Sequence, residues 1–118
     1  MRSIWSSFVL AGLLLAAPAF ADEADDLAKG KAAFNMYCAS CHGQGGDGAG
    51  PVGKALKPSP RDFTIGDFKY GGTDQDIFDV ISNGAASRGG SAMMAPWGAV
   101  IDEPTRWAMV QYIRSFRK

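Results

Sequence analysis

Helical signals in three separate stretches of this 118-residue chain predict an α-helical fold. Apolar residues recur at three- and four-residue spacing in 22–37, a capped apolar stretch occupies 73–84, and a third helical pattern begins after Asp102. The segments between these stretches are rich in glycine and proline, which favours irregular loops. The length suits a single domain. A domain of this size has only a small apolar core, which stabilises the fold weakly by itself.

The first predicted helix covers residues 22–37. Acidic residues crowd its first turn, where they oppose the positive end of the helix dipole. Leu27, Gly30, Phe34 and Tyr37 form one face, which we expect to point into the protein. A glycine in the middle of such a face costs helix stability, so Gly30 predicts either a close crossing by another helix or simply a weak point in an ordinary helix.

Directly after this helix comes Cys38-Ala39-Ser40-Cys41-His42. Two cysteines separated by two residues, with a histidine immediately after the second, have the spacing that attaches a c-type haem covalently. One turn of chain places the two thiols where they can add to the two haem vinyl groups, and the next side chain reaches the iron from the same side. We therefore predict one haem c, attached through Cys38 and Cys41, with His42 as an iron ligand.

Other roles for these three residues are disfavoured. They are the only cysteines and the only histidine of the chain, so a structural zinc site, which needs four such ligands, lacks one. A thioredoxin-like pair needs its first thiol at a helix N-terminus, whereas the helical pattern here runs into Cys38 from upstream. A disulfide between Cys38 and Cys41 would close a tiny loop and remove little chain entropy.

Residues 43–72 are expected to be irregular. Positions 43–51 are too rich in glycine for a helix or a strand. Positions 54–72 contain further prolines and glycines, and we expect an extended loop pinned by its aromatic side chains, which are Phe63, Phe68 and Tyr70.

The two later helices carry clear start signals. The stretch 73–84 opens with a Thr-x-x-Asp capping box and ends at a glycine. Asp102 is an N-cap for the last helix, in which apolar residues again follow helical spacing. We expect this last helix to cross the first one near Gly30, with Phe34 and Tyr112 at the contact.

A pair of methionines precedes the last helix. Residues 85–92 are small and expected to be flexible, and they lead to Met93 and Met94. A methionine thioether is the usual companion of histidine on electron-transfer haems. Pro96 stiffens the residues just before it, which favours Met94 as the iron ligand, whereas Met93 follows a looser run and can pack as filler.

Residues 1–21 predict a secretory signal peptide. Arg2 precedes an apolar run from Ile4 to Ala17, and an A-x-A cleavage site follows at 19–21. The run is short for a membrane span of about 20 residues, which disfavours an uncleaved anchor. We expect cleavage after Ala21, export to the periplasm, and a mature domain at 22–118 that does not insert into a membrane.

The charges of the chain are balanced, with 12 basic and 12 acidic residues. No basic patch dominates, so a nucleic-acid partner is not expected.

The mature chain resembles the monohaem class I cytochromes c of bacteria. The resemblance implies the cytochrome c fold, an all-α fold with three to four short helices around a covalently bound haem. The residues that carry it are the Gly30-x-x-x-Phe34 pattern, the motif from Cys38 to His42, Pro51, the segment 94–97 and the helix from Trp107 to Tyr112.

The resemblance also implies roles for individual residues. His42 would be the proximal iron ligand, a loop methionine the distal ligand, and Trp97 part of the cofactor-binding site. The carbonyl of Pro51 would accept the proton of the His42 ring nitrogen that faces away from the iron. The family often has Met-Pro-Pro-Trp, whereas here alanine follows Met94 and another methionine precedes it, so Met93 remains an alternative ligand.

A haem iron with both axial positions filled has no open site for oxygen or a substrate. We therefore expect an electron carrier and not an enzyme. The carrier would pass single electrons between larger redox proteins such as an oxidase, a reductase or a dehydrogenase. It would act as a monomer or in transient complexes. The alternative is a haem c subunit bound permanently to a membrane or periplasmic oxidoreductase complex. A five-coordinate gas-binding or peroxidase-like haem would require that neither methionine binds.

Overall fold

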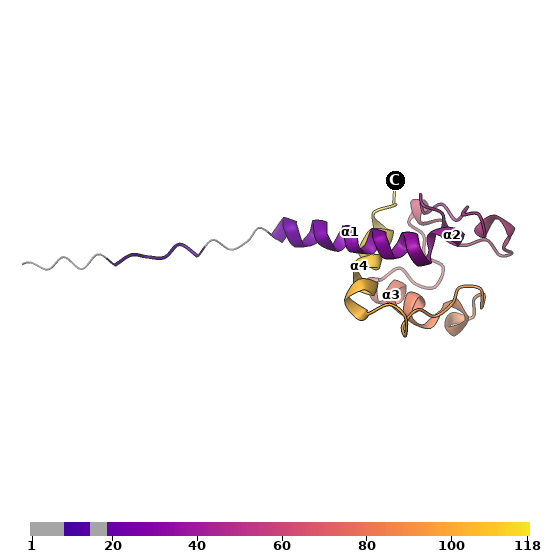
Figure 1. Cartoon of the computed structure of the whole chain (residues 1–118). Helices are drawn as coiled ribbons and strands as arrows, with labels where there is room; N and C mark the ends of the chain where they lie inside the picture. The colour runs from indigo at the N-terminus through magenta and orange to yellow at the C-terminus, as the bar shows by residue number, and fades with distance from the viewer. Residues whose placement is uncertain (1–8, 15–18) are drawn as a thin grey trace, which may run out of the picture.

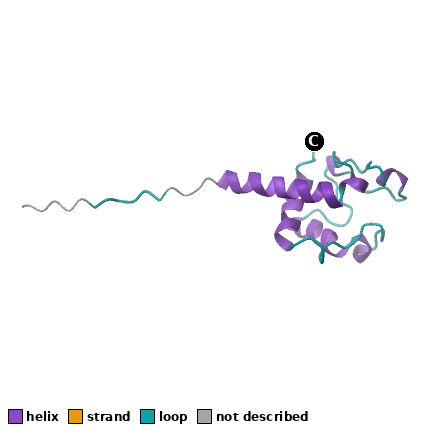
Figure 2. Ribbon diagram, in the orientation of Figure 1, coloured by secondary structure: helices purple, strands orange, loops and turns teal. Residues whose placement is uncertain are grey.

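The computed structural model describes residues 9–14 and 19–118, and within them it contains helices and loops but no β-strand (Figure 2). The all-α prediction is therefore confirmed. In chain order the elements are α1 (Ala19–Tyr37), α2 (Ala39–His42), η1 (Gly53–Ala55), η2 (Phe63–Ile65), α3 (Asp74–Asn83), η3 (Ala85–Arg88) and α4 (Glu103–Arg114), where η marks a 3-10 helix (Figure 1).

Most of the predicted signal peptide at 1–21 lies outside the described residues, which are 9–14 and 19–118. None of the helices in the described part of the chain is both long enough and apolar enough to cross a membrane.

The crossing of α1 and α4 organises the core. Gly30 is buried, and a Cβ atom there would collide with the carbonyl of Ala108 and come within 3.1 Å of the Met109 nitrogen. The rings of Phe34 and Tyr112 meet edge to face with centroids 5.4 Å apart. The predicted crossing, its position and the contact between its two aromatic residues are thus confirmed.

The N-terminal half of α1 extends beyond this crossing (Figure 1). Residues 22–29 are all exposed, and the Leu27 side chain is 40% exposed. The expectation that Leu27 would point into the protein is therefore wrong. Its helical spacing is right, but the buried part of α1 begins at Gly30, so Leu27 lies at the edge of the core.

Side-chain caps begin α3 and α4 as the sequence predicts. The Thr73 hydroxyl accepts a hydrogen bond from the Asp76 backbone N–H at 3.0 Å, and the Asp76 carboxylate accepts one from the Thr73 N–H at 3.1 Å. The Asp102 carboxylate accepts from the Thr105 N–H at 3.0 Å. These bonds pair backbone donors that a helix start otherwise leaves unsatisfied.

One stretch is more ordered than its composition suggests. Residues 85–92, expected to be flexible, begin with the 3-10 helix η3. The Gly89 N–H donates to the Ala86 carbonyl at 3.1 Å, and the Ser87 hydroxyl donates to the Gly84 carbonyl at 2.6 Å. Such i to i+3 bonds form within short runs that carry little apolar periodicity, so sequence patterns predict them poorly.

Candidate haem-binding site

A single turn presents both cysteines and the histidine. The Cys38 N–H continues the ladder of α1 by donating to the Phe34 carbonyl at 2.8 Å. The His42 N–H then donates to the Cys38 carbonyl at 2.9 Å, which closes the turn of α2. The structure thus brings Cys38, Cys41 and His42 together, as predicted. Both thiols are free, with Cys38 buried and Cys41 half-buried.

The environment of Cys38 suppresses its ionisation. Burial, and to a smaller extent the neighbouring Cys41, raises the pKa of the Cys38 thiol to about 12. Because the thiolate is the reactive form of cysteine, this sulfur would stay a neutral thiol at physiological pH in a folded chain to which haem is not yet attached.

The His42 ring is oriented by a backbone carbonyl and by two aromatic rings. Its Nδ1 lies 3.2 Å from the carbonyl oxygen of Arg61. The ring stacks on Phe63, with centroids 4.6 Å apart and planes inclined by 18°, and Phe34 lies 6.5 Å away. A carbonyl oxygen can only accept, so Nδ1 carries the proton and Nε2 keeps its lone pair for a metal ion.

The same surroundings favour the neutral imidazole. Burial lowers the pKa of His42, and the hydrogen bond to the Arg61 carbonyl opposes this effect to a smaller extent. A neutral ring with a free Nε2 is the form that binds a metal.

The acceptor for His42 is a correction to the sequence-based expectation, which gave this role to Pro51. The loop after α2 folds back so that residues 60–63 lie along the glycine-rich turn. The Phe63 N–H donates to the Gly46 carbonyl at 2.7 Å, and a Cβ atom on Gly48 would come within 2.5 Å of the Pro60 carbonyl oxygen. This packing brings the Arg61 carbonyl to the ring.

Pro51 instead lies on the outer side of α2 and is exposed. Its two neighbours hold it there, because the Gly50 N–H donates to the Cys41 carbonyl at 3.1 Å and the Val52 N–H donates to the Ser40 carbonyl at 2.8 Å. Sequence reasoning therefore missed Arg61, which directly follows Pro60 and precedes Phe63 by two positions.

The segment that carries the methionines is docked on the end of α3. The Trp97 N–H donates to the Ile81 carbonyl at 2.9 Å, and the Ala85 N–H donates to the Met94 carbonyl at 3.2 Å. Of the two methionines, Met93 is 64% exposed, whereas Met94 is half-buried.

Trp97 connects this segment to the cysteine motif. Its ring packs against Tyr37, with centroids 5.1 Å apart. Tyr37 ends α1 and directly precedes Cys38, so the methionine segment is anchored at the point where the motif begins.

Comparison with known proteins assigns the family. A family model described as "Cytochrome C oxidase, cbb3-type, subunit III" matches residues 25–113. The chain belongs to this family. Its relatives within the family include the cbb3-type cytochrome c oxidase subunit CcoP of Azospirillum brasilense, which is 29% identical over 87 residues. The corresponding subunit FixP of Azorhizobium caulinodans is 33% identical over 87 residues.

These cbb3-type relatives are longer proteins. The alignments cover 74% of this chain but only 27% of CcoP and 26% of FixP, so the chain spans about a quarter of the length of the curated relatives it matches. A solved chain of the reducing HAO-like protein complex of Kuenenia stuttgartiensis superimposes with a TM-score of 0.68 at 34% identity, covering 75% of this chain and 41% of that one.

The chain is thus a monohaem c-type cytochrome with the cytochrome c fold, and its cofactor is a covalently bound haem c with its iron. The residues of the structure fit that group. Cys38 and Cys41 offer two free thiols on one turn, and the His42 ring is held neutral with its Nε2 lone pair unprotonated.

Proposed function

We propose that this cytochrome is a periplasmic carrier of single electrons, with His42 and Met94 as the axial ligands of its haem iron. The observation that carries the proposal is the packing of Trp97 on Tyr37, which fastens the methionine segment beside the cysteine motif. A bound haem supplies a one-electron change of iron valence. The chain's own residues then provide both axial ligands and leave no coordination position open.

The choice of Met94 over Met93 rests on burial and on backbone restraint. Met94 is half-buried, and its carbonyl accepts a hydrogen bond from Ala85, whereas the Met93 side chain is 64% exposed. A ligand must be presented reproducibly, and a restrained, partly buried residue does so at a lower entropy cost than an exposed one. Trp97, half-buried in the same segment, is proposed to pack beside the haem.

We also propose that the protein does not catalyse a reaction itself. Catalysis at the haem would need an open coordination position and convergent acid-base groups, and the single histidine of the chain is the proposed iron ligand. The signal-peptide pattern of residues 1–21 supports export to the periplasm. In that oxidising compartment two free cysteines would oxidise to each other, and thioether bonds to the haem remove this hazard.

A second candidate is a haem module held permanently in an oxidoreductase complex. The relatives are subunits of cbb3-type oxidases and the structural neighbour comes from a complex, which favours this candidate. Size-exclusion chromatography of a native periplasmic extract separates the two. A free carrier elutes near the mass of one mature chain, whereas a fixed module elutes with its partner at every salt concentration.

The experiment that tests the carrier is spectroscopic. The purified holoprotein should titrate as a one-electron couple, and its reduced form should not bind carbon monoxide at neutral pH. Rapid carbon monoxide binding by the untreated reduced protein would show an open iron position and overturn the carrier in favour of a gas-binding or peroxidase-like haem.

A further inference from the structure

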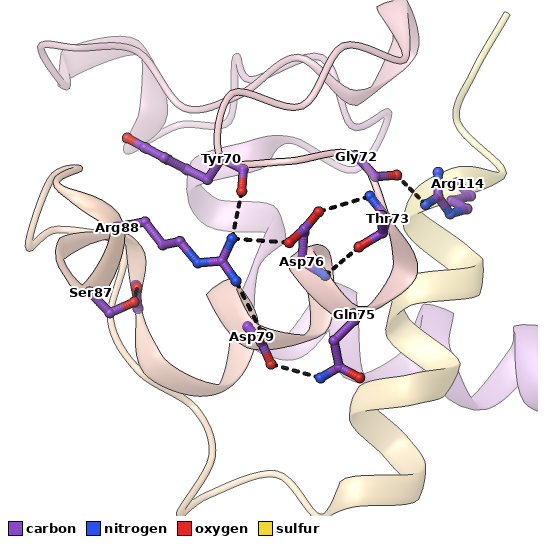
Figure 3. A network of polar contacts seen from close by, with 10 residues as sticks. Tyr70, Gly72, Thr73, Gln75, Asp76, Asp79, Ser87, Arg88 and Arg114 are labelled. Atoms are coloured by element: carbon purple, nitrogen blue, oxygen red, sulfur yellow. Dashed lines mark hydrogen bonds and ion pairs between the residues drawn. The ribbon is translucent and has the colours of Figure 1, made fainter.

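The guanidinium of Arg88 joins three acceptors at the end of η3 (Figure 3). Its Nη1 donates to the Tyr70 carbonyl at 2.8 Å and to the Asp76 carboxylate at 3.1 Å. Its Nη2 donates to the Asp79 carboxylate at 3.0 Å. Arg88 therefore ties η3 both to α3 and to the loop that precedes α3.

The acceptors of Arg88 are themselves held in place (Figure 3). Asp76 belongs to the capping box with Thr73, and Asp79 accepts from the Gln75 side-chain amide at 2.8 Å. The Arg88 side chain is 33% exposed, so these ion pairs are partly shielded from water. Charged hydrogen bonds that are held in a fixed geometry and partly shielded from water contribute more to stability than mobile surface ion pairs do.

The 3-10 helix that Arg88 ends is bonded to the backbone of Met94. The Ala85 N–H donates to the Met94 carbonyl at 3.2 Å, and the Gly90 N–H donates to the Ala85 carbonyl at 2.8 Å. The Met94 N–H in turn donates to the Ser91 carbonyl at 3.3 Å. Residues 85–94 thus form one small hydrogen-bonded unit, which we call the methionine loop.

Arg88 is the main side-chain anchor of the methionine loop. Within the described residues, it is the only member of this loop that forms an ion pair. The loop contains two glycines and a serine in a row at 89–91, residue types that restrict the backbone little by themselves. Without the anchor, backbone hydrogen bonds, the bond from the Ser87 hydroxyl to the Gly84 carbonyl and the burial of Ala85 hold the loop on α3.

We propose that Arg88 is a positioning residue that holds the methionine loop against α3 and so keeps Met94 in place to bind the iron. This inference rests on the proposed role of Met94. Arg88 touches neither the motif nor the ligand; it acts by lowering the fraction of time in which the loop detaches. A loop that detaches more often leaves the sixth iron position open to external ligands more often.

The test uses the oxidised holoprotein and two matched variants. Arg88→Leu removes the anchor of the methionine loop. Arg114→Leu is the control, because Arg114 also donates to an aspartate of α3, Asp74, and to a carbonyl, that of Gly72 at 2.6 Å, but from α4 and away from the loop. For each protein we would measure imidazole affinity, amide hydrogen exchange and the urea midpoint.

Arg88→Leu should bind imidazole about tenfold more tightly than the native protein, which corresponds to ~1.4 kcal/mol of lost loop stability. The Ala85 amide should exchange about tenfold faster as well. Arg114→Leu should lower the urea midpoint but leave both readouts at native values. Arg88→Lys keeps the positive charge but loses the planar, multiply donating guanidinium. Its imidazole affinity and Ala85 exchange rate should lie between those of Arg88→Leu and the native protein.

Native imidazole affinity and native Ala85 exchange in Arg88→Leu would overturn the inference. Equal changes in Arg114→Leu would also overturn it, since they would show a general loss of stability. Failure of Met94 ligation has a different signature, because the native ferric protein would then lack the methionine charge-transfer band; the exchange readout still decides whether Arg88 holds the loop. Should Arg88→Leu not fold, Asp79→Asn replaces one charged acceptor of Arg88 with a neutral one and should give a smaller change in the same direction.

Discussion

Gly30 of α1 lies against the main-chain carbonyl of Ala108 of α4, with no room for even a methyl group between the two helices. This contact sets the depth at which α4 crosses α1. Four residues further along α1, Phe34 is fully buried at the same interface and its ring lies 6.5 Å from that of His42. The helix crossing therefore places buried aromatic side chains behind His42, the proposed iron ligand.

Gly30→Ala should reduce the stability of the fold. The added methyl group must displace the backbone of α4, and overpacking of this kind costs about 1–3 kcal/mol of unfolding free energy. Gly45→Ala is the matched control, since a Cβ atom there meets nothing within 4 Å. Urea denaturation of both holoproteins checks the expectation. Equal midpoints for the two variants would show that the helices separate without cost.

Loss of either motif cysteine should impair haem attachment. The native chain is expected to run from Asp22 with one haem added to its mass, resistant to extraction by acidified acetone. Cys38→Ser and Cys41→Ser should each retain one thioether at best and accumulate poorly. Ser40→Ala, between them on α2 and exposed, is the control and should attach haem normally. Intact-mass measurement after extraction decides, and a native haem that extracts freely would contradict covalent attachment.

Met94→Ala should change the ligation of the haem iron, and Met93→Ala should not. Without Met94 the ferric protein should lose its weak methionine charge-transfer band, its reduction potential should fall, and it should bind external ligands readily. Met93, at 64% exposure, should be replaceable with all three properties near native values. Visible spectra and redox titrations of the two variants provide the check. If the two variants exchange these behaviours, the ligand is Met93. If both variants keep native spectra, neither methionine binds the iron.

Acid should weaken the anchor of the methionine loop through Asp76. Hydrogen bonds from Thr73 and from Arg88 hold the pKa of Asp76 below its ordinary value of 3.8. Because the folded pKa is the lower one, the stabilisation is fully present above pH 3.8 and is lost as the pH falls through the folded value. Asp76→Asn should therefore be less stable than the native protein at pH 7, and the gap should narrow towards pH 2.

The measurement for Asp76 is the urea midpoint of both proteins as a function of pH. Asp25→Asn, on the exposed N-terminal part of α1, serves as the control and should follow the native protein throughout. A gap between Asp76→Asn and the native protein that is independent of pH would show that the carboxylate charge contributes nothing.

The sequence by itself determined the features that depend on neighbouring residues. The haem attachment motif, the capping box at Thr73 and the N-cap at Asp102 each act over a few positions, so their spacing is visible in the chain. The sequence favoured the crossing at Gly30 without settling it, since a glycine in the middle of an apolar helix face marks either a close backbone approach or a weak point in an ordinary helix.

Only the tertiary structure decided the features that join distant parts of the chain. The acceptor for His42 is Arg61, nineteen positions away, and not Pro51, because the path of the glycine-rich loop fixes which carbonyl reaches the ring. The exposure of Leu27 depends on where α4 starts to cover α1, and the anchor at Arg88 depends on how η3 docks on α3. Helical spacing and caps record local backbone preferences, whereas hydrogen bonds across a loop depend on the whole packed chain, and no single stretch of sequence contains that information.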